Sequence, residues 1–400
     1  MNMRWHCRRI HDRDVIMNKY FVMILFALLL LLVPSCAKKA EESIPSTSAV
    51  TGPEETSSSE MKTVKAEIAA ENEVAPEIPE DGEKRYTDNI FYTYSSSLGG
   101  FVLTDNAITY PKDLIIPDTV DGIPVVRIGD YAFGGNTYIS GNLTIPASIE
   151  SIGNGAFSGC TSLTGLWISE GVESVGKQAF SGCTSLRGDL VIPQSVSELG
   201  SGAFSGCRGF NGGLYILGST VIGDSAFLGC YGFKGELQIP EAVSIGASAF
   251  SSCTGFSGDL IIPESVKTIG SSAFQGCTGL DGELFIMGAE TIGSSAFKGC
   301  TSLSGDLVLP SSVRTIGEYA FANCKGLDGC LILPSSLETI ENGVFYNTGF
   351  SCDVIIPESV KIIKSGAFDG THVTPYFTSA YIELSYGAFT AGTVIPPELL

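Results

Sequence analysis

The sequence contains few of the residues on which most enzymes and nucleic-acid-binding proteins depend. Its 400 residues include only three histidines and two tryptophans, and 23 Lys and Arg stand against 43 Asp and Glu, which gives a formal charge of −20. An acidic balance of this size argues against a nucleic-acid partner and against electrostatic adsorption to anionic lipid. It favours solubility and does not by itself specify a partner.

Catalytic motifs are scarce as well. No phosphate-binding loop, dinucleotide-binding fingerprint or zinc-protease motif is present. Beyond the N-terminal region His372 is the only histidine, so a Ser–His or Cys–His device has a single candidate, and an ordinary loop histidine is the simpler interpretation. The few basic residues form no cluster with carboxylates of the kind that a β-helix lyase needs. We therefore expect no enzyme activity and no cofactor.

Residues 1–35 are typical of a secretory signal peptide. Lys19 precedes an apolar run over residues 21–33, which is shorter than a transmembrane helix requires. Residues 1–16 look like an extension of the start site, so we expect Met17 to be the true first residue. The protein is therefore expected to leave the cytoplasm.

The residues that follow the apolar run predict a membrane anchor. Val33-Pro34-Ser35-Cys36 resembles the bacterial lipoprotein box, which implies that Cys36 is lipidated and becomes the first residue of a cell-envelope protein, at the outer membrane or cell surface. A plain signal peptide or an uncleaved anchor is the alternative. Residues 36–85 are rich in Glu, Ser, Thr and Pro and poor in apolar side chains, so they predict a disordered acidic tether.

The segment Ala-Phe-x-x-Cys returns every 23 or 24 residues along most of the chain, with one shorter step at the end. Its phenylalanines are Phe133, Phe157, Phe180, Phe204, Phe227, Phe250, Phe274, Phe297, Phe321, Phe345, Phe368 and Phe389. A period of this length is typical of a solenoid, in which each repeat forms one turn and contacts only its neighbours. We predict a β-rich repeat solenoid of about twelve turns over residues 113–389, with a tail or cap over residues 390–400.

Each repeat contains two extended pieces. Leu-x-Ile has the two-residue period of a strand whose named residues face inward, and the proline that follows in most repeats ends the strand pairing. Val-x-x-Ile-Gly predicts a second short extended piece. Too few residues remain at Ala-Phe-x-x-Cys for a full helix, so we expect a helical or 3₁₀ turn there, with the Phe rings stacked into a buried spine.

A β-hairpin is expected to close the N-terminal end of the array. It lies within residues 86–112, where Ile90–Tyr94 and Leu98–Leu103 alternate or run apolar on either side of a turn. Solenoids need such an element because their terminal repeats otherwise expose the core.

Eight cysteines share one position in the repeat: Cys160, Cys183, Cys207, Cys230, Cys253, Cys277, Cys300 and Cys324. Stacking places equivalent residues about 5 Å apart with parallel side-chain directions, whereas a disulfide needs side chains that face each other. We expect a buried ladder of free thiols and no metal site, because a linear ladder does not converge on one ion. Cys330 and Cys352 lie off this ladder in adjacent repeats, and a disulfide between them is left open.

Carboxylates recur just before the Leu-x-Ile strand, at Asp113, Asp189, Glu236, Asp259, Glu283, Asp306 and Asp353. Stacked like charges repel unless water or cations intervene. A solvated corner is the simpler interpretation, and a calcium-binding ladder is the alternative.

The residue between Leu and Ile must point outward from its strand. Along the array this position holds Ile115, Thr144, Trp167, Val191, Tyr215, Gln238, Ile261, Phe285, Val308, Ile332 and Ile355. Contiguous exposed apolar side chains are typical of interaction sites, and aromatic residues are favoured anchors. Strand propensity alone is the alternative. If the row binds a ligand, we expect Trp167, Tyr215 and Phe285 to be its anchors, with Ile261 and Gln238 beside them.

The full repeat unit resembles the repeats of a known protein family. The unit Leu-x-x-x-Leu-x-Ile-Pro-x-Ser-Val-x-x-Ile-Gly-x-x-Ala-Phe-x-x-Cys, clear at 186–207 and 256–277, resembles the BspA-like leucine-rich repeats. The resemblance implies a solenoid on a secreted or surface-anchored microbial protein, often linked with adhesion to host or matrix proteins. It therefore implies a protein ligand, membrane contact through a lipid anchor, and no fixed reaction. A carbohydrate-binding module and a structural spacer are the alternatives.

Overall fold

The computed structural model of the protein describes residues 76–87, 90–106, 114–379 and 381–395. The predicted signal peptide, the start at Met17, the lipidation site at Cys36 and most of the tether lie outside the described residues. All secondary structure elements in the described ranges are β-strands. No helix long and apolar enough to cross a membrane occurs in them.

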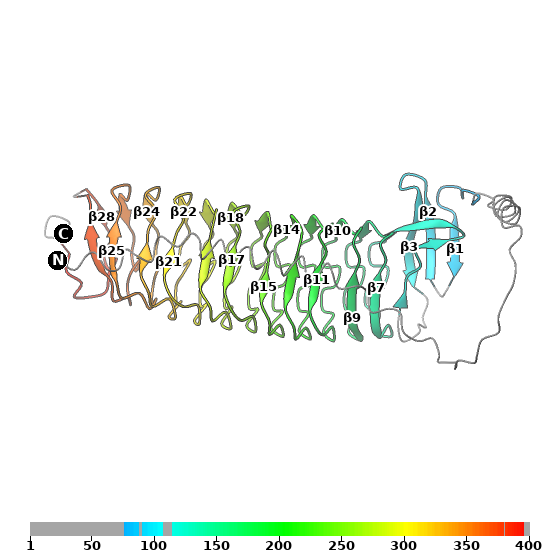
Figure 1. The fold of residues 1–400 in the computed structure, drawn as a ribbon, viewed down its shortest axis with the longest axis horizontal. Helices are drawn as coiled ribbons and strands as arrows, with labels where there is room; N and C mark the ends of the chain where they lie inside the picture. Colours follow the sequence, from blue (N-terminus) through cyan, green and yellow to red (C-terminus); the bar gives the residue numbers. More distant parts are fainter. Residues whose placement is uncertain (1–75, 88–89, 107–113, 380, 396–400) are drawn as a thin grey trace, which may run out of the picture. The chain divides into compact units, whose positions relative to one another are not determined.

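The described chain begins with a three-stranded antiparallel sheet. Its strands are β1 (Lys84–Thr87), β2 (Ile90–Ser95) and β3 (Gly100–Asn106), and β2 with β3 is the predicted hairpin. Alternate residues of β2 are buried, as a strand with one face on the core requires. At its far edge β3 pairs in parallel with β6 (Ile123–Ile128) of the solenoid (Figure 1). The hairpin therefore continues the solenoid sheet and covers its first turn.

The first strand row consists of the Leu-x-Ile strands. Its members are β4 (Leu114–Ile115), β7 (Gly141–Ile145), β9 (Leu163–Ile168), β11 (Leu190–Ile192), β13 (Leu214–Ile216), β15 (Leu237–Gln238), β17 (Leu260–Ile262), β19 (Leu284–Ile286), β21 (Leu307–Val308), β23 (Leu331–Ile332), β25 (Asp353–Ile356) and β27 (Thr374–Phe377). They pair in parallel with equivalent residues opposite one another, so that Leu190 faces Leu214 and Leu214 faces Leu237. Hydrogen bonding divides the row into short sheets of two or three strands.

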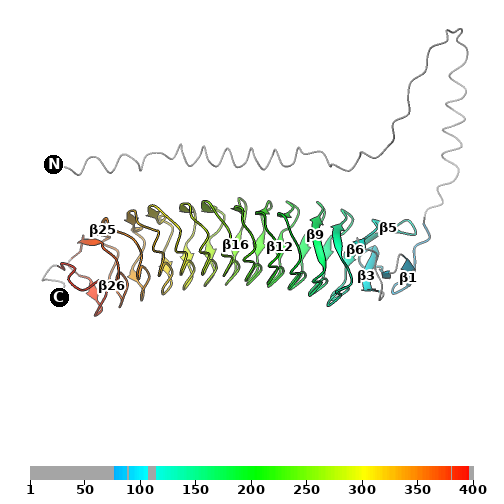
Figure 2. The ribbon, with the colours of Figure 1, turned by 90° about the horizontal axis from the view of Figure 1, so that it is seen from below.

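The second strand row consists of the shorter pieces that precede the Ala-Phe turn. Besides β6 it contains β8 (Ser151–Ile152), β10 (Ser174–Val175), β12 (Glu198–Leu199), β14 (Val221–Ile222), β16 (Ser244–Ile245), β18 (Thr268–Ile269), β20 (Thr291–Ile292), β22 (Thr315–Ile316), β24 (Thr339–Ile340), β26 (Ile362–Ile363) and β28 (Glu383–Leu384). These strands confirm the second extended piece of the repeat. They are also parallel, and β5 (Thr119–Val120) adds an antiparallel partner to β6 (Figure 2).

The Phe side chains form the predicted spine along the core. Neighbouring rings are stacked nearly parallel, with centroids between 4.9 Å (Phe368 to Phe389) and 5.7 Å (Phe321 to Phe345) apart. A second, shorter stack joins Phe210, Phe233 and Phe256, which replace the leucine that opens other repeats. Both stacks are sealed from solvent except at the C-terminal end of the spine.

The turn around each spine Phe is not helical, which corrects the expectation of a helical or 3₁₀ turn. The residues two before and two after the Phe have positive φ in every repeat but the last, where only Gly387 does, and Ser248 (56°) and Ser252 (62°) around Phe250 are an example. Alternate N–H groups donate to the carbonyl three residues back, and the others donate to the next repeat; the Phe250 N–H reaches the Ala273 carbonyl at 2.7 Å. The left-handed residues prevent helical continuation and aim every second amide along the stack.

The eight ladder cysteines are buried and free, as predicted. Each thiol donates to the carbonyl of the spine Phe in the preceding repeat, as Cys253 Sγ does to Phe227 O at 3.1 Å. Burial raises the pKa of the Cys160 and Cys230 thiols to about 12. The thiols are therefore structural hydrogen-bond donors between repeats.

The last repeats replace cysteine with other links. Thr348 and Thr371 take the ladder position, are buried, and donate to the carbonyl of their own spine Phe at 2.9 and 2.7 Å. Cys330 and Cys352 form a disulfide between adjacent repeats, which answers the question left open by the sequence. The covalent link thus joins two repeats where the consensus fades, while the two threonine hydrogen bonds each stabilise the turn of a single repeat.

Candidate functional site

The candidate site is the outward side of the first strand row, which we call the outward row. Register pairs its side chains across strands: Val191 lies opposite Tyr215, Ile261 opposite Phe285, and Ile355 opposite Tyr376. Their neighbours along each strand are buried, as in the buried, half-buried, buried pattern of β17 and β19. The alternation that was predicted from Leu-x-Ile therefore produces a row of mainly apolar outward side chains, which the buried Gln238 interrupts.

Exposure along the outward row is greatest towards its two ends. Ile115 and Trp167 are 76% and 63% exposed near the first turns, and Ile355 and Tyr376 are 62% and 67% exposed near the last. The side chains between them are half-buried or polar, with Val308 as an exposed exception. Large apolar side chains with most of their area in water are unusual unless they contact a partner.

Of the predicted anchors, Trp167 is the most accessible. Tyr215, Ile261 and Phe285 are half-buried, so each presents part of its side chain. Gln238 departs from the prediction because it is only 9% exposed and its Nε2 donates to Glu236 Oε2 at 2.7 Å. The amide is thus turned along its own strand, and Gln238 is removed from the set of contact residues.

Tyr376 belongs to the outward row and was missed from the sequence. Its strand reads Thr374-Pro375-Tyr376-Phe377 and lacks the Leu-x-Ile pattern, so nothing in the repeat consensus marks it. Only the register with β25 places Tyr376 beside Ile355. The two side chains form the most exposed apolar pair at the C-terminal end of the row.

Tyr215 shows how the outward row meets the carboxylates beside it. The Tyr215 ring folds back over Gly213, where a Cβ would lie 2.7 Å from the Tyr215 hydroxyl. Gly213 occupies the repeat position that holds Asp189 and Glu236 in the neighbouring repeats. Burial raises the pKa of Tyr215, and the negative charges of Asp189 and Glu236 raise it further. The phenol therefore lies between two carboxylates of neighbouring repeats.

Several of the recurring carboxylates also link repeats. Asp189, Asp259 and Asp306 each accept a hydrogen bond from a backbone N–H of the next repeat, at 2.8, 3.0 and 2.7 Å. Within the described ranges no group of three or more His, Cys, Asp or Glu side chains is arranged to hold a metal ion. These three aspartates thus have a structural role in addition to their charge.

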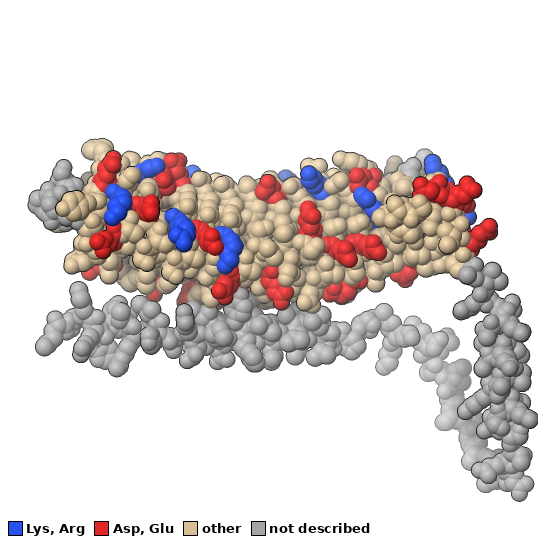
Figure 3. All heavy atoms as spheres, turned by 90° about the horizontal axis from the view of Figure 1, so that it is seen from above, with Lys and Arg blue, Asp and Glu red and all other residues tan. Residues whose placement is uncertain are grey.

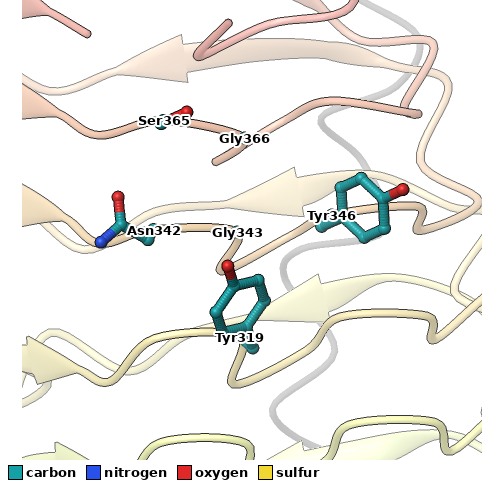
Figure 4. Close-up of a pocket in the computed structure, with 6 residues that line it drawn as sticks. All are labelled: Tyr319, Asn342, Gly343, Tyr346, Ser365 and Gly366. Atoms are coloured by element: carbon teal, nitrogen blue, oxygen red, sulfur yellow. The ribbon is translucent and has the colours of Figure 1, made fainter.

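A shallow hollow lies away from the outward row, beside the spine turns of three late repeats. It has a volume of about 240 Å³ and is lined by Tyr319, Asn342, Gly343, Tyr346, Ser365 and Gly366 (Figure 4). The Tyr319 ring covers Gly343 so closely that a Cβ on this glycine would lie 2.4 Å from the ring edge. The next repeat has Gly366 where four earlier repeats have serine, which leaves the space open.

His372, the one catalytic candidate, has no catalytic setting in the described structure. Its side chain is exposed, and only its backbone N–H forms a hydrogen bond, to Phe350 O at 3.1 Å. The ladder thiols are buried, and burial raises the pKa of Cys207, Cys230 and Cys253 among them. A thiol of this kind is neither accessible nor nucleophilic.

Comparison with known proteins identifies the repeat. The family profile of the BspA type leucine rich repeat region, which holds six copies, matches residues 112–234, 220–325 and 284–393. A search of curated proteins finds no match.

Solved structures similar to this chain include three bacterial proteins. A leucine rich cell surface protein from Faecalibacterium prausnitzii is 20% identical over 74% of this chain and 95% of its own, with a TM-score of 0.41. A leucine-rich repeat protein from Bacteroides ovatus is 23% identical over 74% of this chain and all of its own, with a TM-score of 0.36. The pneumococcal vaccine antigen PcpA is 19% identical over 80% and 93%, with a TM-score of 0.43. Because the family profile covers more than half of the sequence, the chain belongs to the BspA-type leucine-rich repeat family.

Proposed function

We propose that this protein is a lipid-anchored protein of a bacterial cell surface that binds a protein partner through its outward row and so serves in adhesion. The observation that carries the proposal is the mainly apolar outward row, with Trp167, Ile355 and Tyr376 mostly exposed. A solenoid gains a long surface by stacking repeats, and such surfaces are commonly used for protein binding.

An extracytoplasmic location has two supports. The Cys330–Cys352 disulfide is of the kind that persists in oxidising compartments. The N-terminal sequence is typical of an export signal, and the residues that end at Cys36 resemble a lipoprotein box. We expect Cys36→Ala to release the protein from the membrane fraction and to abolish incorporation of labelled fatty acid. Unchanged labelling would rule out this residue as the anchor.

The binding proposal is tested with the full chain, immobilised and exposed to host matrix proteins and to envelope extract. Wild type is compared with the triple variant Trp167→Ala, Tyr215→Ala, Phe285→Ala, and a matched control carries Tyr131→Ala and Tyr231→Ala on exposed tyrosines outside the row. We expect the row variant to lose capture of any specific partner and the control to keep it. Equal capture by all three proteins would contradict the proposal.

We also propose that the protein has no enzymatic activity. The support is chemical, because the exposed His372 has no partner residue in the described structure and the ladder thiols are buried. Turnover that depends on His372 would contradict this.

A second candidate function, carbohydrate binding, is favoured by the hollow at Tyr319 and Tyr346. Its volume suits a single sugar ring, and it offers aromatic surface with hydroxyl and amide groups. Gly366→Ser should fill it at a backbone cost of about 1 kcal/mol, which Ser248 and Ser272 already bear at a similar positive φ in other repeats. Loss of binding to methyl glycosides in Gly366→Ser, with Gly202→Ser as control, is the expected result; binding unchanged by Gly366→Ser would exclude this site.

A further inference from the structure

Charge is distributed unequally between the two strand rows. Acidic side chains flank the outward row at both ends of its strands, and we call these the acidic margins: Asp118, Glu170, Asp189, Glu236, Glu241, Asp259, Glu264, Glu283, Asp306, Asp353 and Glu358. These acids come from two positions of the repeat, directly before the Leu of Leu-x-Ile and two residues after its Ile. In the described repeats, neither position holds a Lys or Arg. Two exposed basic residues, Arg187 and Lys234, lie two positions before Asp189 and Glu236, so the outward row is bordered mainly, and not exclusively, by negative charge.

The second strand row carries charges of both signs. In the C-terminal half of this row, the residue before or at the start of each strand alternates in the sign of its charge: Lys267, Glu290, Arg314, Glu338, Lys361 and Glu383. Stacked in adjacent repeats, opposite charges attract one another across strands. Basic and acidic side chains lie interleaved along one face of the array (Figure 3). The contrast between the rows is confined to the C-terminal half, because Glu150, Glu173 and Glu198 make the first part of the second strand row acidic as well. Lys267 and Lys361 also reach the margin, where they donate to the backbone carbonyls of Glu264 and Glu358 at 3.0 and 2.9 Å.

Part of the margin charge is not explained by the fold. Asp189, Asp259 and Asp306 accept backbone hydrogen bonds, so their positions serve the stacking of repeats. The side-chain carboxylates of Glu264, Glu283 and Glu358 form no hydrogen bond or ion pair within the described residues and are exposed. Like charges along a stack oppose folding unless a ligand or solvent compensates them.

Tyr215 locates the margins within reach of a ligand on the outward row. Beyond the effect of burial, the charges of Asp189 and Glu236 act on its hydroxyl and raise its pKa. A molecule that contacts this ring therefore also approaches two carboxylates. Both carboxylates accept one hydrogen bond within the protein, but a partner with apolar side chains alone would desolvate them and leave their charge without a cation, which weakens binding. A partner with apolar side chains flanked by Lys or Arg would satisfy both.

We propose that the partner of the outward row is a cationic, amphipathic protein segment, whose apolar side chains pack on Trp167 and its neighbours while its Lys and Arg side chains pair with the acidic margins. This inference rests on the proposed function and specifies its partner. Electrostatic attraction at the margins raises the association rate, and the apolar contacts hold the complex.

The test uses the full chain and three synthetic peptides of equal length with alternating Lys and Leu, Glu and Leu, or Lys and Ser. We expect the Lys–Leu peptide to bind at least about tenfold more tightly than either other peptide, and its affinity to fall about tenfold between 0.05 and 0.5 M salt. Equal binding of the Glu–Leu peptide would overturn the role of the margins. Equal binding of the Lys–Ser peptide would overturn the role of the apolar row.

Two variants with the same change in net charge locate the effect. Glu264→Gln, Glu283→Gln, Glu358→Gln neutralises three margin acids, and Glu290→Gln, Glu338→Gln, Glu383→Gln neutralises three exposed acids of the second strand row. We expect the first to lose about tenfold in affinity for the Lys–Leu peptide and the second less than twofold. Equal losses would overturn the inference, because they would show attraction to net charge only.

The proposed function and the inference fail in distinguishable ways. A protein partner that binds through Trp167, Tyr215 and Phe285 but is insensitive to salt and to the margin variant supports the proposed function and overturns the inference. Peptide binding that the alanine variant of the row leaves unchanged overturns both.

Discussion

Replacing Phe250 in the middle of the spine should measure how strongly the repeats are coupled. Its ring is fully buried and stacks on Phe227 and Phe274, with centroids 5.3 and 5.1 Å away. Phe250→Ala opens a cavity and removes both stacks, and burial of this kind is worth about 3–5 kcal/mol. Each stacked pair accounts for about 0.5–1.5 kcal/mol of that loss.

Position along the array provides the internal comparison. Phe389 ends the spine, is only partly buried, stacks on Phe368, and has one edge-to-face contact, with Phe377 at 6.1 Å between centroids. Phe389→Ala should therefore cost about 2 kcal/mol or less. Phe250→Leu keeps most of the volume and loses the stacking, so we expect about 1–1.5 kcal/mol.

Urea unfolding followed by circular dichroism gives the free energy of unfolding for each variant. Because each repeat contacts only its neighbours, Phe250→Ala should also separate the transition into two steps, one for each side of the weakened repeat. Hydrogen exchange of the backbone amides should be faster in whichever group of repeats, before or after Phe250, is the less stable one. A loss below about 1 kcal/mol for Phe250→Ala, or an equal loss for Phe389→Ala, would refute the assignment of the spine as the main source of coupling.

Three further outcomes follow from the fold. Ser272→Gly should raise the free energy of unfolding by about 1 kcal/mol in thermal melts, because serine at φ 57° is strained and glycine is not; a decrease would contradict this. Loss of the disulfide through Cys330→Ser with Cys352→Ser should lower the stability of the last repeats by about 2–4 kcal/mol, and unchanged urea unfolding there would count against it. Burial raises the pKa of Cys160 and Cys230 above the ordinary thiol value of 9.0 to about 12, so stability should be full below pH 9 and should fall as pH rises towards 12; urea midpoints that stay level over this range would refute the burial argument.

The spine and the thiol ladder could be predicted because their residues repeat. A Phe and a Cys at a fixed period have only one arrangement that buries all of them, which is a stack along the axis. The second stack was accessible by the same reasoning, since Phe210, Phe233 and Phe256 occupy the position of a repeated leucine.

The turn geometry and parts of the outward row could not be predicted for physical reasons. The left-handed position before the spine Phe holds Gly, Ser, Gln or Tyr, and no shared side chain marks it, because the backbone hydrogen bonds of the stack impose the conformation. The burial of Gln238 depends on a side-chain hydrogen bond to Glu236, which a period does not encode. Tyr376 lies in a repeat whose consensus is lost, so only strand register reveals it.

The most direct test of the account is hydroxyl-radical footprinting of the full chain with and without the Lys–Leu peptide. Trp167 and Tyr376 are both mostly exposed on the outward row, while Tyr131 and Tyr231 are exposed elsewhere on the array. We predict that the peptide protects Trp167 and Tyr376 from oxidation and leaves Tyr131 and Tyr231 unchanged. Protection of Tyr131 and Tyr231 without protection of the outward row would contradict the assignment of function to this face.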